Sequence, residues 1–328
     1  MERTKPRVTI VGLGLIGGSI GLALRQVEAA SSVVGHDVNR EASAQANKLG
    51  AVDKTHWNLL AACEDADLVI LATPVDAVQA TLEAIGPHLR PGCVVVDTAA
   101  VKRPVLAWAA EHLPDSVFFV GGNPILGPAS DGLGGLAEAR SDLFQGGLFC
   151  IVPSPAANEN AVELVVGLVQ VLGAKPLFLD VAEHDGLVAA VDHLPALLDL
   201  ALMEMVVGQP TWRELRKMAG PSFELGTGLV STDPAIYAGL CQSNRDNVLR
   251  WIDAFSNALD SVRGALVEDE PDVLAERFLA ALVERQKWLA DRSTGLWQEG
   301  PRTEMPERPS LIDSFLGTFW RRKPKPGA

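Results

Sequence analysis

Three glycines near the N-terminus have the spacing of a dinucleotide-binding turn. They lie in the run Gly12-Leu13-Gly14-Leu15-Ile16-Gly17, which directly follows a β-branched segment that ends at Val11. Gly12 permits a tight turn, Gly14 lets the backbone approach a pyrophosphate, and Gly17 lets the next helix pack close to the strand. This turn therefore predicts a dinucleotide site, and a glycine-rich turn without a ligand is the alternative.

The helix expected over Ile16–Arg25 would point its free N–H groups and its positive dipole end at the cofactor phosphates. Leu15 and Ile16, at its start, are therefore expected to contact the cofactor. Thr73 and Pro74 close a later strand-like segment, and this position places them near the nicotinamide ribose in a fold of this kind.

An acid completes the same unit. Asp37 stands twenty positions after Gly17, at the end of the segment Ser32–His36, which has the pattern of a second strand. Its carboxylate can accept both hydrogen bonds of an adenine ribose diol, and it would repel the 2′-phosphate of NADP. Arg40 lies close enough to soften that preference. We expect NAD as the cofactor, with NADP as the alternative.

Strand-like apolar segments alternate with helical patterns through the first half of the chain. Further strands are expected at Asp67–Ala72, Cys93–Asp97, Val117–Val120, Phe149–Val152 and Pro176–Leu179. The segment Gly121–Pro124 has the composition of a turn. This alternation predicts an α/β Rossmann domain over residues 1–181, with a doubly wound, mostly parallel sheet.

The pattern changes to long helices after Glu183. Helical patterns cover Glu183–Gln209, Trp212–Met218, Pro234–Glu268 with breaks, and Pro271–Arg292. An all-α domain over residues 182–295 is expected to close over the cofactor and to form a homodimer interface. Residues 296–328 form a proline-rich, basic tail. Its short amphipathic piece could dock on the dimer or touch a membrane surface.

Composition limits the classes of function. The chain has 328 residues, 48% of them hydrophobic, and a net charge of −13, which argues against a nucleic-acid partner. We expect no signal peptide, because the first apolar run is the expected strand itself, and no transmembrane segment, because no uninterrupted apolar stretch is long enough. A cytoplasmic protein is therefore expected. The four cysteines are scattered without metal-ligand spacing, so no metal is expected.

Several motifs fall in the order seen in one enzyme family. They are GLGLIGGSIGLALR, ADLVILATPV, VVDTAAVKRPVL, FFVGGNPILGP, LFCIVPSP and AEHDGLVAAVDHLPALL. In this order the chain resembles the prephenate and arogenate dehydrogenases over about residues 7–290. The resemblance implies a dinucleotide domain followed by a helical dimerisation domain. It also implies oxidation and decarboxylation of a cyclohexadienol on the route to tyrosine.

The chain departs from this family where the chemistry should occur. Asn123 stands in Gly121–Gly127 at the place of a catalytic histidine, and Ala100 stands at the place of a serine. Gly228 replaces an arginine that pairs with a substrate carboxylate in the family. An asparagine amide can hydrogen-bond a substrate hydroxyl or carbonyl but cannot accept a proton. Asn123 is therefore a candidate site residue with a changed role.

His193 is the best remaining proton acceptor. It matches a family histidine that faces the substrate, and Asp192 is available to raise its basicity. A structural role before Leu194 is the alternative. His184 is expected to be structural, and Lys102 is expected to stabilise its loop or contact the cofactor rather than act as a base.

Three functions remain open from the sequence. The first is an NAD-dependent dehydrogenase of the prephenate or arogenate type, acting on a cyclic carboxylic acid. The second is a dehydrogenase of the same fold for a different, less anionic cyclic alcohol or acid, favoured by Asn123 and Gly228. The third is a non-catalytic NAD-binding homologue that kept only the nucleotide cradle.

Overall fold

The computed structural model describes residues 5–127, 135–231, 234–268, 271–295 and 297. Internal contacts group Met1–Gly295 into one compact unit and Leu296–Ala328 into another. The amphipathic piece expected in the tail lies outside the described residues.

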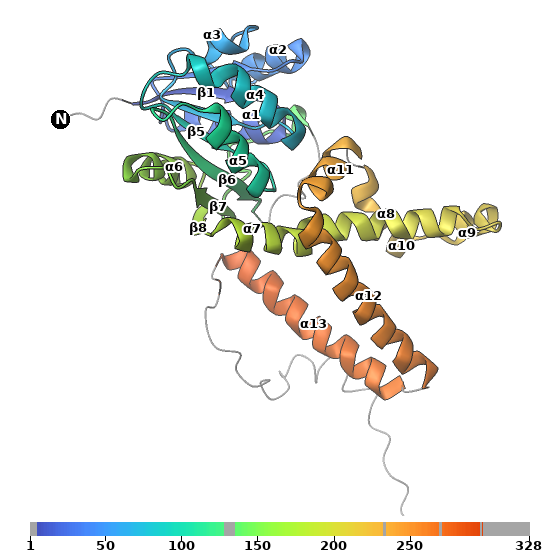
Figure 1. The fold of residues 1–328 in the computed structure, drawn as a ribbon. Helices are drawn as coiled ribbons and strands as arrows, with labels where there is room; N and C mark the ends of the chain where they lie inside the picture. The colour runs from blue at the N-terminus through green and yellow to red at the C-terminus, as the bar shows by residue number, and fades with distance from the viewer. Residues whose placement is uncertain (1–4, 128–134, 232–233, 269–270, 296, 298–328) are drawn as a thin grey trace, which may run out of the picture. The chain divides into compact units, whose positions relative to one another are not determined.

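A sheet forms the first part of the fold, in the order β3-β2-β1-β4-β5-β6-β7-β8 (Figure 1). Its strands are β1 (Arg7–Val11), β2 (Ser32–His36), β3 (Lys54–Thr55), β4 (Leu68–Leu71), β5 (Val94–Asp97), β6 (Phe118–Ile125), β7 (Leu148–Pro153) and β8 (Lys175–Phe178). Neighbouring strands are parallel except for β6 and β7. The strand order turns back between β1 and β4, which is where open α/β sheets bind ligands. The predicted doubly wound, mostly parallel sheet is confirmed.

Helices cover both faces of this sheet. They are α1 (Leu15–Gln26), α2 (Arg40–Lys48), α3 (Leu59–Cys63), α4 (Val75–Ile85), α5 (Arg103–His112) and α6 (Glu159–Val171), with 3₁₀ turns at Gly86–His88 and Leu136–Glu138. Alternate residues of β4 enter two separate cores, Leu68 and Ile70 on one face and Val69 and Leu71 on the other. Every residue of β4 must therefore be apolar, because the side chains on both faces of this parallel strand are buried.

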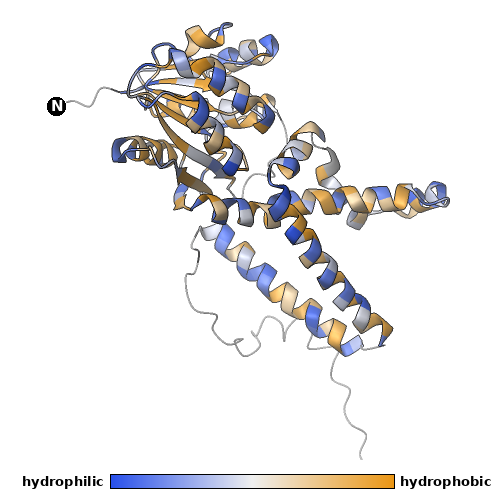
Figure 2. Ribbon diagram, viewed as in Figure 1, coloured by the Kyte–Doolittle hydropathy of each residue, from blue (hydrophilic) through white to orange (hydrophobic). Residues whose placement is uncertain are grey.

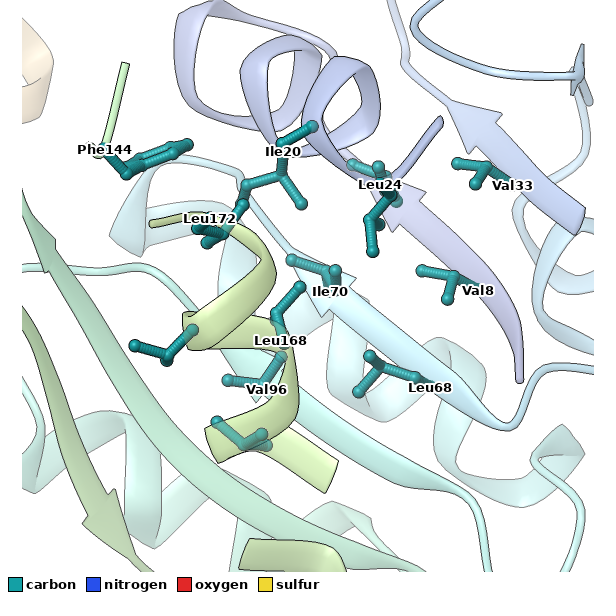
Figure 3. Packing of buried hydrophobic residues seen from close by; sticks show 14 of the residues in the cluster. Val8, Ile20, Leu24, Val33, Leu68, Ile70, Val96, Phe144, Leu168 and Leu172 are labelled. Atoms are coloured by element: carbon teal, nitrogen blue, oxygen red, sulfur yellow. The ribbon is translucent and has the colours of Figure 1, made fainter. Parts of the chain in front are cut away.

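Figure 3 shows the core on the face of α1 and α6. Ile20 and Leu24 of α1 and Leu168 of α6 meet Ile70 of the sheet there, and Leu172 packs beside them. The opposite core is formed with α4 and α5. These two layers hold the carboxyl ends of β1, β4 and β5 at one edge, where the predicted cofactor residues lie.

The strand β6 corrects one expectation from the sequence. Gly121–Pro124 is not a turn, because β6 continues through it to Ile125 and pairs with β7 in antiparallel register. Gly122 accepts this position because a Cβ atom there would collide with the carbonyl oxygen of Asp97. Asn123 therefore lies on a strand, opposite Cys150, and is held more rigidly than a loop residue.

The second part of the structure is helical, as predicted. It contains α7 (Val181–Val188), a π-helical turn (Ala189–His193), α8 (Leu194–Val207), α9 (Trp212–Met218), α10 (Pro221–Leu225), a 3₁₀ turn (Gly228–Ser231), α11 (Pro234–Ser243), α12 (Arg245–Val267) and α13 (Pro271–Thr294). The first helix begins two residues before the expected start, because the Asp180 side chain caps it by accepting from the Glu183 N–H at 2.8 Å.

Among the described helices, one run is long and apolar enough to cross a membrane. It is Val181–Val207, and 33% of its most apolar part is buried inside the fold. Most of α8 is orange in Figure 2, in keeping with this composition. The run also contains His184, Asp185 and His193, which are buried within the folded unit. Burial of these polar groups in hydrogen-bonded contacts is typical of a helix in a folded domain.

Candidate active site

The glycine turn has a backbone that only glycine fits at two points. Gly12 joins β1 to α1 at φ +93°, and a Cβ atom there would collide with the carbonyl oxygen of Ala72. A Cβ atom on Gly17 would collide with the carbonyl oxygen of Gly12. Gly14 has no atom within 4 Å of its Cβ position. The backbone is therefore open to a pyrophosphate on the side of Gly14.

The start of α1 is prepared for an anion. Gly14 is the N-cap of α1, no side chain caps the helix, and its first turn contains no acid. Leu15 is buried and Ile16 is half-buried at this end. The first N–H groups of a helix lack partners within the helix, so they remain available to phosphate oxygens. The residues present thus fit a dinucleotide.

Asp37 is tied to the glycine turn. Its Oδ2 accepts a hydrogen bond from the Leu13 N–H at 2.7 Å, and its Oδ1 accepts one from the Asn39 N–H at 2.7 Å. Each carboxylate oxygen has a further lone pair for a ribose hydroxyl. Arg40 is exposed as the first residue of α2. The acid expected to bind the ribose is therefore held against the turn expected to bind the phosphates.

Thr73 and Pro74 follow β4 at the same edge of the sheet. The Thr73 backbone nitrogen lies 3.0 Å from the Cβ position of Gly12, so this segment borders the glycine turn. The Thr73 hydroxyl is buried without a hydrogen-bond partner among the described residues. Buried hydroxyls are normally hydrogen-bonded, so a ligand that enters the cradle has a free polar group to meet.

A buried ion pair marks the end of β5. The Asp97 carboxylate accepts hydrogen bonds from the Lys102 ammonium, from the Ala99 N–H at 2.9 Å and from the Gly122 N–H at 3.0 Å. Lys102 is fully buried. Burial lowers the pKa of Lys102, and Asp97 opposes that shift. Lys102 thus fixes the loop between β5 and α5, which is one of the two roles expected for it.

Asp185 of α7 connects the helical part to the sheet. Its Oδ1 accepts from the Lys102 N–H at 2.7 Å, and its Oδ2 accepts from the Arg103 N–H at 2.8 Å. His184 Nδ1 lies 2.9 Å from Oδ1. Burial by itself would raise the pKa of Asp185, but these hydrogen bonds outweigh it and lower the pKa. Asp185 therefore remains an anion at the N-terminus of α5.

His184 and Asn123 meet beneath this carboxylate. Because ionised Asp185 is only an acceptor, His184 carries its proton on Nδ1 and keeps a lone pair on Nε2. Nε2 lies 3.1 Å from Nδ2 of Asn123, which donates to it. His184 is completely buried and Asn123 is 5% exposed. His184, expected to be structural, thus contacts the candidate site residue Asn123 directly.

His193 ends the π-helical turn and is also completely buried. Nδ2 of Asn244 donates to the Asp185 carbonyl oxygen at 2.7 Å and lies 3.4 Å from His193 Nδ1. Asn247 donates to Asn244 Oδ1 at 2.8 Å, which fixes the amide orientation. His193 Nδ1 is therefore an acceptor, and the ring carries its proton on Nε2.

His193 Nε2 has no hydrogen-bond partner among the described residues, and Asp192 Oδ2 lies 3.6 Å from it. Burial lowers the pKa of His193, and Asp192 and the backbone of Ala100 act against this shift. A neutral His193 can therefore donate Nε2–H to a substrate oxygen. Its capacity to accept a proton, expected from the sequence, would need a change of tautomer.

Two of the three positions that depart from the family pattern lie at the site. Asn123 belongs to it, and Ala100 packs against the core formed with α4 and α5 while its backbone contacts His193. Gly228 begins a 3₁₀ turn, and its Cβ position has no atom within 4 Å. Asp199 accepts from the Leu229 N–H at 2.9 Å beside it. The charged group next to position 228 is thus the Asp199 carboxylate, which would repel a substrate carboxylate.

Asp97, His184 and Asp185 are the site residues that the sequence did not single out as functional. Asp97 ends a buried strand, and an acid at the carboxyl end of a parallel strand is a detectable signal.

Within the described part of the chain, no group of three or more His, Cys, Asp or Glu residues could hold a metal. Burial raises the pKa of the Cys63 and Cys93 thiols to about 12, so they remain protonated.

Two family models match the chain. The nucleotide-binding domain of prephenate dehydrogenase matches residues 20–177, and the dimerization domain of prephenate dehydrogenase matches residues 180–280. Together they cover the strands β2 to β7 and most of the helical part.

Individual relatives agree with these models. The chain is 26% identical to the prephenate dehydrogenase of Bacillus subtilis (strain 168) over 283 residues, 86% of this chain and 76% of that protein. It is 26% identical to the cyclohexadienyl dehydrogenase of Zymomonas mobilis over 274 residues, 83% of this chain and 92% of that protein.

Solved structures share the fold. The prephenate dehydrogenase from A. aeolicus, in complex with hydroxyphenyl propionate and NAD+, has a TM-score of 0.80 at 24% identity, covering 88% of this chain and 99% of that one. The arogenate dehydrogenase of Synechocystis has a TM-score of 0.70 at 24% identity, covering 86% and 99%. Both the order of the two parts and their architecture are common to these proteins.

Proposed function

The chain belongs to the prephenate dehydrogenase family, and on that premise we propose that it is an NAD-dependent dehydrogenase for a cyclohexadienyl acid of the prephenate or arogenate type. Relatives named prephenate, cyclohexadienyl and arogenate dehydrogenase support this substrate class. The bound nucleotide supplies the hydride acceptor. The protein itself must bind the ring acid, orient its hydroxyl and exclude water.

One observation carries the proposal, a buried network that we call the polar junction. It consists of Asn123, His184, Asp185, His193 and Asn244. Within it, His193 Nε2–H has no partner and Asn123 Oδ1 receives no hydrogen bond from the described residues. One donor and one acceptor can therefore bind a substrate that carries a hydroxyl and carboxylates. We assign substrate contact to His193 and Asn123.

The cofactor assignments follow from the cradle. Gly14, Leu15 and Ile16 would border the phosphates, Gly12 and Gly17 shape the turn, and Thr73 and Pro74 would border the ribose on the nicotinamide side. Asp37 favours NAD because its carboxylate repels a 2′-phosphate. Arg40, exposed on α2, is the group that would contact NADP if it bound.

Formation of NADH tests the proposal. Purified protein is mixed with NAD and either prephenate or arogenate, and absorbance at the NADH band is followed at micromolar enzyme concentration. We expect NADH and carbon dioxide in equal amounts from at least one of the two acids. Binding of NAD without any turnover of either acid would reject the enzyme and leave the non-catalytic homologue as the function.

A second candidate is a dehydrogenase of the same fold for a less anionic ring substrate. The observation that favours it is the pair Asp192 and Asp199, with glycine at position 228. The pKa of Tyr237 is raised to about 12, mainly by burial and further by Asp192, Cys241 and Asp199. The two carboxylates thus place negative charge near Tyr237. A panel of cyclic alcohols tests it, and turnover of prephenate alone would exclude it.

We also propose a homodimer, located in the cytoplasm, with domains at 1–181 and 182–295 and a tail at 296–328. The family model for residues 180–280 describes a dimerization domain. Leu200, Met205 and Val207 of α8 are exposed apolar residues on that part. The net charge of −13 supports a soluble protein without a nucleic-acid partner.

A further inference from the structure

Asn123 uses one end of its amide inside the protein and leaves the other end free. Nδ2 donates to His184 Nε2 at 3.1 Å. No hydrogen bond from the described residues reaches Oδ1. Since the side chain is 5% exposed on a paired strand, its orientation is restricted. The direction of the amide decides whether the site offers a ligand an acceptor or a donor.

A chain of hydrogen bonds sets the direction of the amide. The chain begins at backbone N–H groups, which can only donate a hydrogen bond. The backbone N–H groups of Lys102 and Arg103 are obligatory donors, and both point at the Asp185 carboxylate. The carboxylate therefore accepts the third bond, from His184 Nδ1–H at 2.9 Å. His184 Nε2 is left with a lone pair, which Asn123 Nδ2 must satisfy. Oδ1 is then the only end that can face a ligand.

We propose that Asp185 and His184 are positioning residues that fix the Asn123 amide, so that Oδ1 accepts a hydrogen bond from the substrate hydroxyl. The inference rests on the proposed function, since it concerns the hydroxyl that becomes a carbonyl. An acceptor aimed at that hydroxyl orients the O–H bond away from the carbon that loses hydride. Asn123 thus retains the orienting part of a histidine's role without its proton-accepting part.

This arrangement depends on the tautomer of His184. In the other tautomer Nε2 would be a donor, the Asn123 amide would have to reverse, and Nδ2 would face the ligand in place of Oδ1. Two groups fix the tautomer of the ring, Asp185 at Nδ1 and Asn123 at Nε2.

Two substitutions at one position separate this role from others. In His184→Gln, Oε1 can replace Nε2 as acceptor for Asn123 but cannot be protonated, whereas His184→Leu removes the acceptor. We expect His184→Gln to keep kcat within about 5-fold of the wild type, because the glutamine amide can bridge Asp185 and Asn123 as the ring does. We expect His184→Leu to lose about 10²-fold in kcat with little change in KM for NAD.

A matched control is His112, the last residue of α5, which is partly buried and lies at the opposite end of α5 from the N–H groups that Asp185 accepts. His112→Gln and His112→Leu should match each other and the wild type in kcat. Equal loss of kcat in His184→Gln and His184→Leu would overturn the proposal, as would wild-type kcat in both.

A measurement without turnover decides the case if neither ring acid is oxidised. In protein labelled with 15N-histidine, the ring nitrogen shifts of His184 report its tautomer at neutral pH. A protonated Nδ1 with an unprotonated Nε2 supports the proposal even where the proposed function fails. A protonated Nε2 would overturn the proposal whatever the enzyme does.

Discussion

Position 228 is glycine, where the resemblance to the family leads us to expect a carboxylate-binding arginine. Its Cβ position is open, so a side chain can be added without displacing a neighbour. We expect Gly228→Arg to lower KM for prephenate, a dianion, about 10-fold or more, with a smaller effect for arogenate. A bidentate arginine–carboxylate pair is the physical reason.

Gly220→Arg is the control for that substitution. Gly220 also has an open Cβ position and lies in the same part of the chain, before α10. It should leave KM for both acids unchanged. Steady-state kinetics with the two acids checks the pair, and equal effects at both positions would contradict a specific role for position 228.

Asp37 carries a second prediction at the scale of single residues. Asp37→Ser removes the carboxylate that faces the expected ribose and that also accepts from Leu13 and Asn39. We expect KM for NAD to rise about 10-fold while KM for NADP falls, because the repulsion of a 2′-phosphate is lost. Steady-state kinetics with each nucleotide measures this. A parallel rise of both constants would show that the acid only stabilises the turn.

At the scale of elements, the contact between α7 and α5 depends on one carboxylate. The hydrogen bonds that lower the pKa of Asp185 stabilise its charged form in the folded chain. Such a group adds stability above its ordinary pKa of 3.8 and loses it as pH falls through the lower folded value. Asp185→Asn should therefore lower the free energy of unfolding by about 3 kcal/mol at pH 7.

That difference should shrink when pH falls below 3.8, which denaturant titrations at several pH values would show. The control is Asp180→Asn, because Asp180 is the N-cap of α7 and asparagine caps helices equally well. Its free energy of unfolding should stay within about 0.5 kcal/mol of the wild type. A pH-independent loss in Asp185→Asn would contradict the electrostatic explanation.

Local patterns predicted most elements of the sheet, because burial on both faces requires apolar runs such as those of β4 and β5. Local patterns wrongly predicted a turn at Gly121–Pro124, since the pairing of this segment with β7 depends on residues distant in the sequence. The contact of His184 with Asn123 could not be predicted for the same reason. Its tautomer is set by Asp185, whose partner Lys102 is 83 positions away.

At the scale of the whole molecule, the exposed side chains of α8 are the candidate dimer surface. Leu200 is 42% exposed in a single chain, and Met205 is 58% exposed. Leu200→Glu should weaken the dimer at least about a hundredfold, because a charge would be buried in the interface. Light scattering over a concentration series measures the change in mass.

Leu49→Glu is the matched control, since Leu49 is 43% exposed but lies at the end of α2, on the sheet part. It should leave the mass unchanged. A wild-type chain that is monomeric at micromolar concentration would contradict the proposed dimer, as would a dimer that Leu200→Glu does not weaken.

Hydride transfer from the ring is the central claim. The direct measurement uses a cyclohexadienyl acid deuterated at the ring carbon that carries the hydroxyl, with NAD and the full-length protein. Mass spectrometry then follows the nucleotide and the ring product. We predict one deuterium in the reduced nucleotide and an aromatic product that has lost carbon dioxide. Reduced nucleotide without deuterium, or intact acid after prolonged incubation with excess enzyme, would contradict the account.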